Sequence, residues 1–461
     1  MANYVLLERI TVGAAGASSV TFNNIPQTGG YTDLLIKTSI RANNSSGSQG
    51  WYDSQITFNG ISSGYTIKAL YGNGSSAASF SDTVIYDDLA SSATPNYTFS
   101  NSEIYIPNYT SSNAKSISID SVTENNATSS KAGLYAGLWS YTGNPAINKV
   151  TITGLNSSIF QQYSTFSLYA LAAVGTTPTK APKAIGGDII QTDGTYWYHA
   201  FLSSGSFTPQ TALSCDVLVV AGGGSGGVRI GAGGGAGGLL ALSSQALNAN
   251  TAQTVIIGAG GAAAVDSAGT GVAGNNGGNS SFGSISGTVY GGGGGGAYTG
   301  IVGKSGGSGG GGSYDSAPGT GTSLQGNNGG VGIFGSGVAS GGGGGAGAVG
   351  GSVVSAGVAG SGGAGVNTIS WSGGTLSNAL TVLGLGVSGY LAGGGGGSAN
   401  TTAGSGGAGG GGAGTIGTAS PAGSGVANTG SGGGGTRDSN DTGGFVSGAG
   451  GSGLVIVRYA Y

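Results

Sequence analysis

Residues 215–238 read CDVLVVAGGGSGGVRIGAGGGAGG, and residues 453–461 read GLVIVRYAY. The first stretch passes within a few residues from aliphatic side chains to glycine, and the second returns to the same kind of apolar segment. Both apolar segments are rich in the β-branched and aliphatic residues that favour strands. We therefore predict that the two segments pair, so that the chain between them is one long closed excursion from a two-stranded base.

Glycine dominates this excursion. The chain has 461 residues and 107 glycines, and 88 of those glycines follow residue 220. The longest run is Gly291 to Gly296, and eight charged residues lie beyond Gly222: Arg229, Asp266, Lys304, Asp315, Arg437, Asp438, Asp441 and Arg458. Ordering each glycine costs roughly 0.5–1 kcal/mol more than ordering alanine, so a disordered linker is one interpretation. Apolar groups such as Val255-Ile256-Ile257 between the runs argue against it.

The ordered alternative is a lattice of polyglycine II helices, which are threefold, left-handed and free of internal hydrogen bonds. Their N–H and C=O groups point outward and can bond to neighbouring helices wherever no Cβ blocks the approach. At a rise of about 3.1 Å per residue, a six-glycine run spans about 19 Å. Strict Gly-X-Y repetition and a recurring Asp are both missing, which excludes collagen and a Ca²⁺-binding β-roll. We predict polyglycine II packing for residues 222–461, with 453–461 as the closing strand.

The part before the glycine runs has a different pattern. Residues 1–174 contain about ten short segments in which apolar and polar residues alternate, separated by Gly, Asn, Ser and Pro. This period of two is typical of half-buried antiparallel strands. We predict an all-β chain with a jelly-roll-like β-sandwich at 1–174, a linker at 175–186 and a short β neck at 187–221.

Motifs for catalysis or cofactor binding are weak. Gly222, Gly224 and Gly227 fit a dinucleotide fingerprint, but the sequence that follows cannot form the required helix. His199 lies in an alternating strand, and it is the only histidine of the chain. The carboxylate pairs Asp87-Asp88 and Asp438 with Asp441 are interpreted as solvated turn residues. We expect no enzyme, no catalytic residues, no cofactor and no metal site.

The net charge and the N-terminal sequence limit the kinds of partner and location that we expect for the protein. The net charge is -3 and no cluster of Lys or Arg exists, so we expect no nucleic-acid partner. MANYVLLERI does not resemble a secretory signal, and no stretch of apolar residues reaches the length of a membrane span. We therefore expect synthesis in the cytoplasm and no insertion into a membrane.

The segments between glycine runs are the better functional candidates. Several carry an aromatic residue beside polar groups, as in Ala297-Tyr298-Thr299, and loop aromatics supply contact surface at a low entropic cost. An alternative role as small core anchors remains open for Trp371 and Tyr390. The predicted receptor-binding residues are Tyr298, Tyr314, Phe334, Trp371 and Tyr390.

Two resemblances give these patterns a context. The alternation of glycine runs with variable segments resembles the tip adhesins of T-even-type tailed phages, which implies a polyglycine II bundle whose loops bind a host receptor. TDGTYWYHAF at 192–201, DVLVVAGGGSGG at 216–227 and GAGGSGLVIVRYAY at 448–461 are similar to glycine-rich domains in tail-fibre proteins of aquatic phages. Residues 10–43 resemble β-domains of phage structural proteins.

The resemblances imply a bacteriophage structural protein on the virion surface, a tail fibre or adhesin for host attachment. In that role the sandwich contacts other virion proteins, and the C-terminal loops contact a host surface glycan or an outer-membrane protein. By analogy with fibres, a homo-oligomer, with a trimer favoured, is expected. Alternatives are a capsid head-fibre or decoration protein and a cellular extracellular glycine-rich matrix or surface protein.

Overall fold

A computed structural model describes residues 4–43, 51–90, 98–123, 131–173, 181–267, 269–298, 300–333, 337–371, 374–440 and 443–461. The chain divides into two compact units. The first comprises residues 1–183, 188–197 and 461, and the second comprises 184–187 and 198–460. The strands predicted as a neck are thus distributed over both units. Residues 175–180 of the predicted linker lie outside the described residues.

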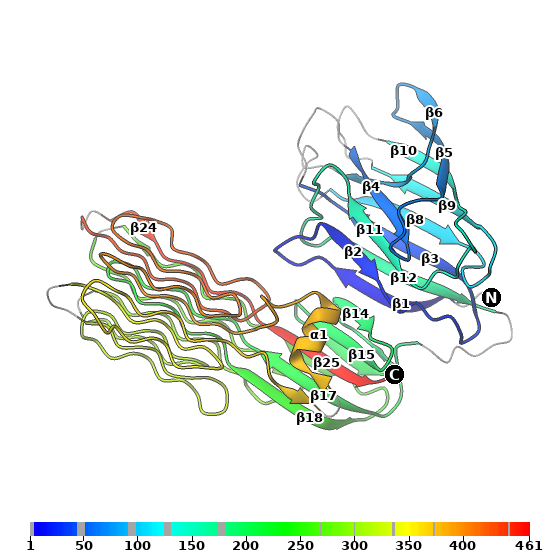
Figure 1. The fold of residues 1–461 in the computed structure, drawn as a ribbon. Helices are drawn as coiled ribbons and strands as arrows, with labels where there is room; N and C mark the ends of the chain where they lie inside the picture. Colours follow the sequence, from blue (N-terminus) through cyan, green and yellow to red (C-terminus); the bar gives the residue numbers. More distant parts are fainter. Residues whose placement is uncertain are drawn as a thin grey trace. The chain divides into compact units, whose positions relative to one another are not determined.

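The first unit contains two antiparallel sheets (Figure 1). The larger sheet has, in spatial order, β14 (Ile189–Thr192), β1 (Tyr4–Thr11), β12 (Thr165–Ala172), β3 (Tyr31–Ile40), β8 (Ser100–Ile106), β9 (Lys115–Val122), β10 (Ala132–Trp139), β5 (Tyr65–Gly72) and β6 (Ala77–Asp82). The smaller sheet has β2 (Ser19–Phe22), β11 (Val150–Gly154), β4 (Trp51–Phe58) and β7 (Ile85–Ala90).

The connectivity of these sheets is that of a jelly roll. The order β1-β12-β3-β8 in one sheet is matched by β2-β11-β4-β7 in the other, and the hairpins β5-β6 and β9-β10 extend the first sheet. Inward side chains of both sheets form one apolar core that includes Ile36, Phe58, Ile152 and Phe166, all 0% exposed. The strict alternation of buried and exposed residues in β9 illustrates the period of two. The predicted jelly-roll sandwich is therefore confirmed.

Short strands form the base of the second unit. One sheet runs β18 (Leu239–Leu247), β17 (Leu213–Val220), β25 (Leu454–Ala460) and β15 (Tyr196–Phe201), and a second runs β13 (Ala184–Ile185), β16 (Gly205–Pro209), β19 (Gln253–Ile256) and β21 (Ser281–Phe282). β25 pairs with β17 in antiparallel register, with Val457 opposite Val217. This confirms the predicted closure of the glycine-rich excursion.

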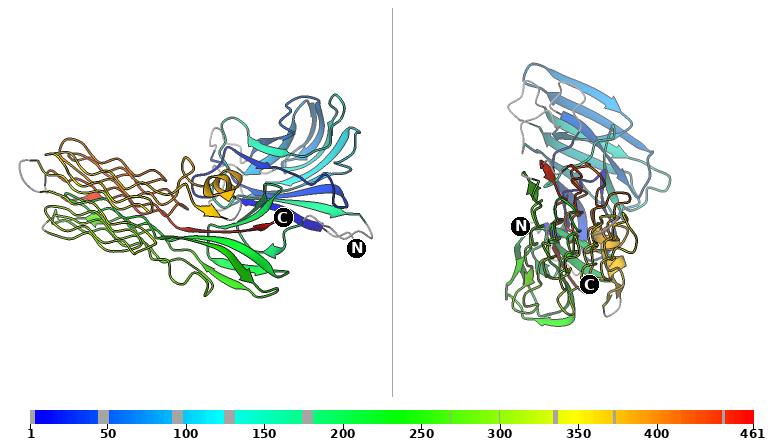
Figure 2. Two further views of the ribbon diagram at one scale, coloured as in Figure 1. Left: turned by 60° about the horizontal axis from the view of Figure 1, so that its bottom comes forward. Right: turned by 90° about the vertical axis from the view of Figure 1, so that its left-hand side faces the viewer.

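From this base the glycine-rich chain runs outward and back many times, as Figures 1 and 2 show. The outer end of this bundle carries β20 (Val265–Asp266) paired with β24 (Phe445–Val446). Beside the base lie β22 (Ser370–Trp371), β23 (Gly374–Thr375) and α1 (Leu376–Leu383). α1 is capped by Thr375 and ends at Gly384, which has φ 65°. Among the described residues, no helix is long and hydrophobic enough to cross a membrane.

Backbone hydrogen bonds in the bundle follow a period of three. Gly222 and Ser225 donate to the carbonyls of Gly278 and Asn275, at 3.0 and 2.9 Å. The residues between and after them donate to two other neighbouring segments, so that every third residue points to the same neighbour. The remaining pairs are Gly223 to Gly451, Gly226 to Gly448, Gly224 to Gly235 and Gly227 to Ala232. This rotation is the pattern that a threefold helix imposes.

The same segment also accepts hydrogen bonds from further neighbours. The carbonyls of Gly222 and Ser225 accept from Gly292 and Gly295. Those of Gly224 and Gly227 accept from Gly433 and Thr436, and Gly223 accepts from Gly261. Residues 222–227 are thus enclosed by backbone on all sides, as in a hexagonal lattice. A Cβ on Gly223 would lie 2.1 Å from the carbonyl oxygen of Ser431, so no other residue fits. These contacts support the predicted polyglycine II packing.

Candidate functional site

The outer end of the bundle brings together three loops that are distant in sequence. Val228 forms isolated bridges with Val272 and Thr436. The N–H of Tyr298 donates to the carbonyl of Arg229 at 3.0 Å, and the hydroxyl of Ser313 donates to the carbonyl of Ile230. A backbone contact and the Ser313 hydroxyl therefore hold the loop at 228–230 beside Tyr298 and beside the turn at 313–316.

Their side chains form a compact group, which we call the outer cluster: Arg229, Tyr298, Tyr314 and Asp315. The rings of Tyr298 and Tyr314 meet edge to face, with centroids 4.8 Å apart and an interplanar angle of 80°. The guanidinium carbon of Arg229 lies 3.8 Å from the ring centroid of Tyr298, a cation–π contact. Desolvation and then the neighbouring Tyr298 raise the pKa of Tyr314, against the opposing charge of Arg229.

Backbone conformation in these loops is unusual for the residues present. Arg229 and Ile230 have φ of 60° and 57°, and Tyr314 and Asp315 have φ of 49° and 58°. The N–H of Ser316 donates to the carbonyl of Ser313 at 2.7 Å, which closes a tight turn around the second pair. Side chains at positive φ cost of order 1–3 kcal/mol each, and such residues cluster at functional sites. In a chain this rich in glycine, their presence indicates that the side chains serve a purpose.

The other predicted receptor-binding residues lie elsewhere. Trp371 is 4% exposed at the base, and the guanidinium carbon of Arg458 lies 4.8 Å from its ring centroid, which makes it a core anchor. Tyr390 is half-buried and forms an antiparallel bridge with Val387. Phe334 lies outside the described residues. The structure therefore brings together two of the five, Tyr298 and Tyr314.

Arg229 and Asp315 were not among the predicted site residues. Both are charged residues of a region that contains eight, and both lie between glycine runs. That scarcity of charge in the glycine-rich region was a usable signal. Asp315 adjoins Tyr314 in the sequence, but the proximity of Arg229 to Tyr298 could not be predicted, because it depends on the register of the lattice.

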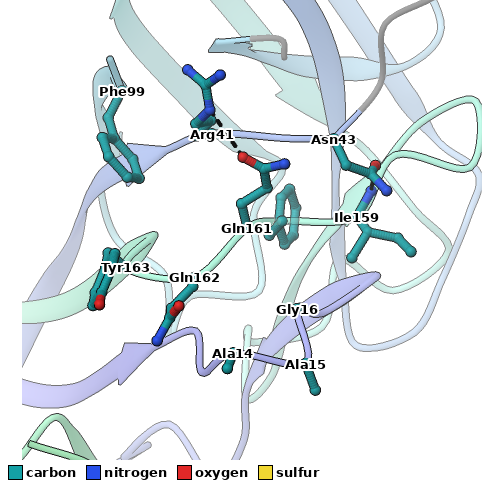
Figure 3. A pocket seen from close by; sticks show the side chains of 11 residues that line it. Ala14, Ala15, Gly16, Arg41, Asn43, Phe99, Ile159, Gln161, Gln162 and Tyr163 are labelled. Carbon is teal, nitrogen blue, oxygen red and sulfur yellow. Dashed lines mark hydrogen bonds between the residues drawn. The ribbon is translucent and has the colours of Figure 1, made fainter. Parts of the chain in front are cut away.

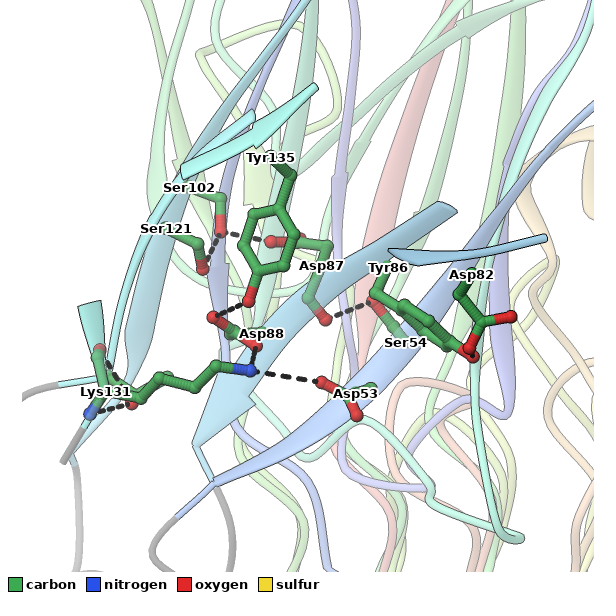
Figure 4. Close-up of polar contacts among 11 residues, drawn as sticks. Asp53, Ser54, Asp82, Tyr86, Asp87, Asp88, Ser102, Ser121, Lys131 and Tyr135 are labelled. Carbon is green, nitrogen blue, oxygen red and sulfur yellow. Dashed lines mark hydrogen bonds and ion pairs between the residues drawn. The ribbon is translucent and has the colours of Figure 1, made fainter. Parts of the chain in front are cut away.

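Buried carboxylates occur in the sandwich (Figure 4). Asp87 and Asp88 lie in β7 and are both 0% exposed, so the prediction that they are solvated turn residues is wrong. Lys131 Nζ lies 2.7 Å from Asp88 Oδ1, and the hydroxyl of Tyr135 donates to Asp88 Oδ2 at 2.6 Å. Lys131, just before β10, and Tyr135, in β10, thus provide the ion pair and the hydrogen bond that Asp88 needs inside the sandwich.

Asp87 faces neutral donors instead. The hydroxyl of Ser102 donates to its Oδ1, and Ser102 and Ser121 are linked at 3.0 Å. Burial raises the pKa of Asp87 to about 7, and the hydrogen bond from Ser102 opposes the shift only in part. Burial also raises the pKa of Asp53, 3.8 Å from Lys131 Nζ, to about 6. These groups have the character of a polar core inside the sandwich.

Two other residues considered for catalysis, His199 and Asp438, form hydrogen bonds within the fold. His199 Nδ1 lies 2.6 Å from the carbonyl oxygen of Gly186, and its Nε2 lies 2.9 Å from the hydroxyl of Tyr459. Complete burial lowers the pKa of His199 to about 4. Asp438 is 0% exposed, so the prediction that it is solvated is wrong. Its carboxylate accepts from the N–H groups of Asn440 and Gly443 in its own loop, while Asp441 is outside the described residues. Within the described part of the chain, no group of three or more His, Cys, Asp or Glu side chains could hold a metal ion.

Comparison with known proteins identifies the second unit. The model of a family described as a glycine-rich domain matches residues 202–460. No curated protein matches the chain.

Proposed function

Because this chain belongs to the glycine-rich domain family, we propose that it uses a rigid glycine lattice to present recognition loops, as a virion surface protein of a tailed phage. In this proposal it is a tail fibre or adhesin, and the outer cluster binds a receptor on the host cell. The observation that carries the proposal is that Arg229 and Tyr314, two residues with positive φ, both contact the ring of Tyr298 at the outer end of the bundle.

Physical reasoning supports a binding role for this end. The lattice fixes the backbone from several directions, so loops at its end lose little further entropy on binding. Tyr and Arg are the residue types that dominate binding energy at interfaces. Loops on a rigid scaffold can also vary in sequence without disturbing the scaffold.

The sandwich has the complementary role in this proposal, attachment to other virion proteins at the virion surface. A homotrimer is the proposed assembly, by analogy with fibres. The resemblance of residues 192–201 and 216–227 to glycine-rich tail-fibre domains supports the phage origin. The competing hypothesis is a capsid head-fibre or decoration protein, which would share the fold but not bind cells.

Adsorption to cells distinguishes these roles. Labelled full-length protein is incubated with the bacterium on which the phage grows, and bound protein and inhibition of infection are measured. We expect wild type to bind and compete, and Tyr298→Ala/Tyr314→Ala to lose at least about tenfold in affinity, or 1.4 kcal/mol. Tyr290→Ala is the matched control, because Tyr290 is a 47% exposed tyrosine at the base end of the same bundle.

Two further outcomes complete the test. Tyr298→Phe/Tyr314→Phe keeps both rings and should retain most of the binding if ring contact dominates. Folded wild-type protein that neither binds cells nor competes with infection would reject the adhesin role, and density for the chain on the capsid of an intact particle would then establish the decoration role.

A further inference from the structure

A separate pocket lies in the sandwich, remote in sequence from the loops discussed above (Figure 3). Its volume is about 600 Å³, within the range of small-molecule sites. The walls come from the loop at 14–16 after β1, Arg41 and Asn43 just after β3, Phe99 before β8, and the loop at 159–163 before β12. All of these residues belong to the first unit.

The polar wall is pre-oriented by a buried guanidinium. Arg41 is 6% exposed, and its Nε donates to Gln161 Oε1 at 2.9 Å, while Nη1 donates to the carbonyl of Thr98 at 3.2 Å. A guanidinium has only donors, so Gln161 must turn its oxygen toward Arg41. Its NH2 group is thereby left to donate elsewhere, and Figure 3 shows the amide nitrogen on the side away from that contact. Asn43 Oδ1 accepts from the N–H of Ile159 at 2.9 Å, which fixes a second carboxamide.

The aromatic wall contains a strained and exposed tyrosine. Tyr163 is 61% exposed and has φ of 73°. The N–H of Ser164 donates to the carbonyl of Gln161 at 3.1 Å, so Tyr163 is the third residue of a tight turn. A positive φ at that place is the geometry of a type II turn, which strongly favours glycine. The N–H of Tyr163 also donates to the carbonyl of Val12 at 3.0 Å, which holds the ring at the pocket.

The combined chemistry selects a class of ligand. Tyr163 and Phe99 provide aromatic surface, three carboxamides (Asn43, Gln161 and Gln162) provide both donors and acceptors, and the lining residues include no carboxylate. A sugar has an apolar C–H face for such a ring and hydroxyl groups for the amides. Because Arg41 is buried and directed at Gln161 and Thr98, an anionic group is not required. We propose that this pocket binds a neutral carbohydrate of one or two sugar units.

The strain at Tyr163 provides a sharp test. Full-length protein is examined by saturation-transfer NMR against methyl glycosides of glucose, galactose, mannose and N-acetylglucosamine. Wild type is expected to show transfer to at least one glycoside. Tyr163→Gly should abolish that transfer while leaving the melting temperature equal to or above that of wild type, because glycine relieves the positive φ. Tyr163→Phe should retain the transfer, since it keeps the ring.

Controls separate this site from other sugar contacts. Tyr141→Ala removes another exposed tyrosine of the sandwich, 38% exposed, and should leave transfer intact. Tyr298→Ala/Tyr314→Ala should also leave it intact, which makes the outcome independent of the adhesin role. Transfer that persists in folded Tyr163→Gly, transfer that disappears only in the outer-cluster variant, or no transfer to any of the four glycosides would overturn the proposal.

Discussion

Arg458 in β25 donates two hydrogen bonds to Oδ2 of Asp216 in β17, from Nη2 at 2.6 Å and from Nε at 3.2 Å, across 242 residues of chain. The two side chains are 1% and 6% exposed. Asp216 Oδ1 also accepts from the N–H of Ser244 in β18 at 2.9 Å. The pair therefore joins the first and last strands of the glycine-rich excursion inside its base.

Removing one partner of this pair should destabilise the second unit. Asp216→Ala leaves the buried guanidinium without its carboxylate, and we expect a loss of about 3–5 kcal/mol in the free energy of unfolding. Urea unfolding measures the change. Glu103→Ala breaks the exposed pair with Lys37, whose side chains are 57% and 51% exposed, and should cost less than about 1 kcal/mol. Equal effects of the two substitutions would contradict this account of the base.

A single methyl group inside the lattice should be poorly tolerated. In Gly434→Ala the new Cβ would lie 1.9 Å from the carbonyl oxygen of Ala413, so neighbouring helices must separate. We expect a loss of at least about 3 kcal/mol, at the upper end of overpacking effects. Gly205→Ala is the control, because its Cβ would meet only the ring of Phe201 at 3.7 Å. Melting temperatures and soluble yields compare the two, and a stable Gly434→Ala protein would be inconsistent with direct backbone packing.

Side chains complete the hydrogen bonding where the lattice ends. The N–H of Gly291 donates to Asn279 Oδ1 at 2.9 Å, and that of Gly294 donates to Asn276 Oδ1 at 3.0 Å. Gly291 and Gly294 are three residues apart, which is one turn of the helix. The two carboxamides therefore accept the hydrogen bonds that a neighbouring polyglycine helix would otherwise accept. Asn276→Ala should cost about 1 kcal/mol and should accelerate amide exchange at Gly294 more than at Gly295, whose N–H donates to the backbone carbonyl of Ser225. Exchange resolved to single glycines by NMR checks this, and uniform acceleration would argue against a local cap.

The alternation of apolar and polar residues and the runs of glycine made the sandwich and the glycine-rich bundle predictable from the sequence. Alternation in segments such as Lys115–Val122 indicated a half-buried sheet. The apolar strands around Val217 and Val457 indicated their pairing. α1 was not predicted, although Thr375 and Gly384 are recognisable capping residues, because eight residues are too few to display a clear 3.6-residue period.

Features that depend on distant partners were not predictable. The burial of Asp88 depends on Lys131 and Tyr135, which the fold brings to β7 from a separate hairpin. The burial of Asp87 depends on the hydroxyl of Ser102 in β8. The outer cluster depends on how many residues separate successive glycine runs, because that number sets which loops meet. For Trp371 the sequence left two roles open, a receptor contact and a core anchor, since nothing local to it reveals the guanidinium of Arg458.

The buried carboxyl of Asp87 should make the sandwich less stable as pH rises. Its pKa is about 7 in the fold, against about 3.9 in an unfolded chain. Between these values the unfolded state has lost the proton and the folded state has kept it. The free energy of unfolding therefore falls through this window, by at most about 1.4 kcal/mol per pH unit. Stability from this group is complete below about pH 4 and is lost by the time pH exceeds about 7.

Asp87→Asn tests this because an amide cannot ionise yet can still accept from Ser102. The variant should gain stability relative to wild type as pH increases from 5 to 8, a range that covers the upper part of the window. Asp53, with a pKa of about 6, contributes the same sign in both proteins and cancels in the comparison. Asp120→Asn removes an exposed carboxyl from β9 and controls for net charge. For each protein, the urea midpoint of unfolding is measured at each pH from the amide exchange of peptides from β7 and β8. Parallel plots of stability against pH for Asp87→Asn and wild type would show that Asp87 is ionised in the fold throughout.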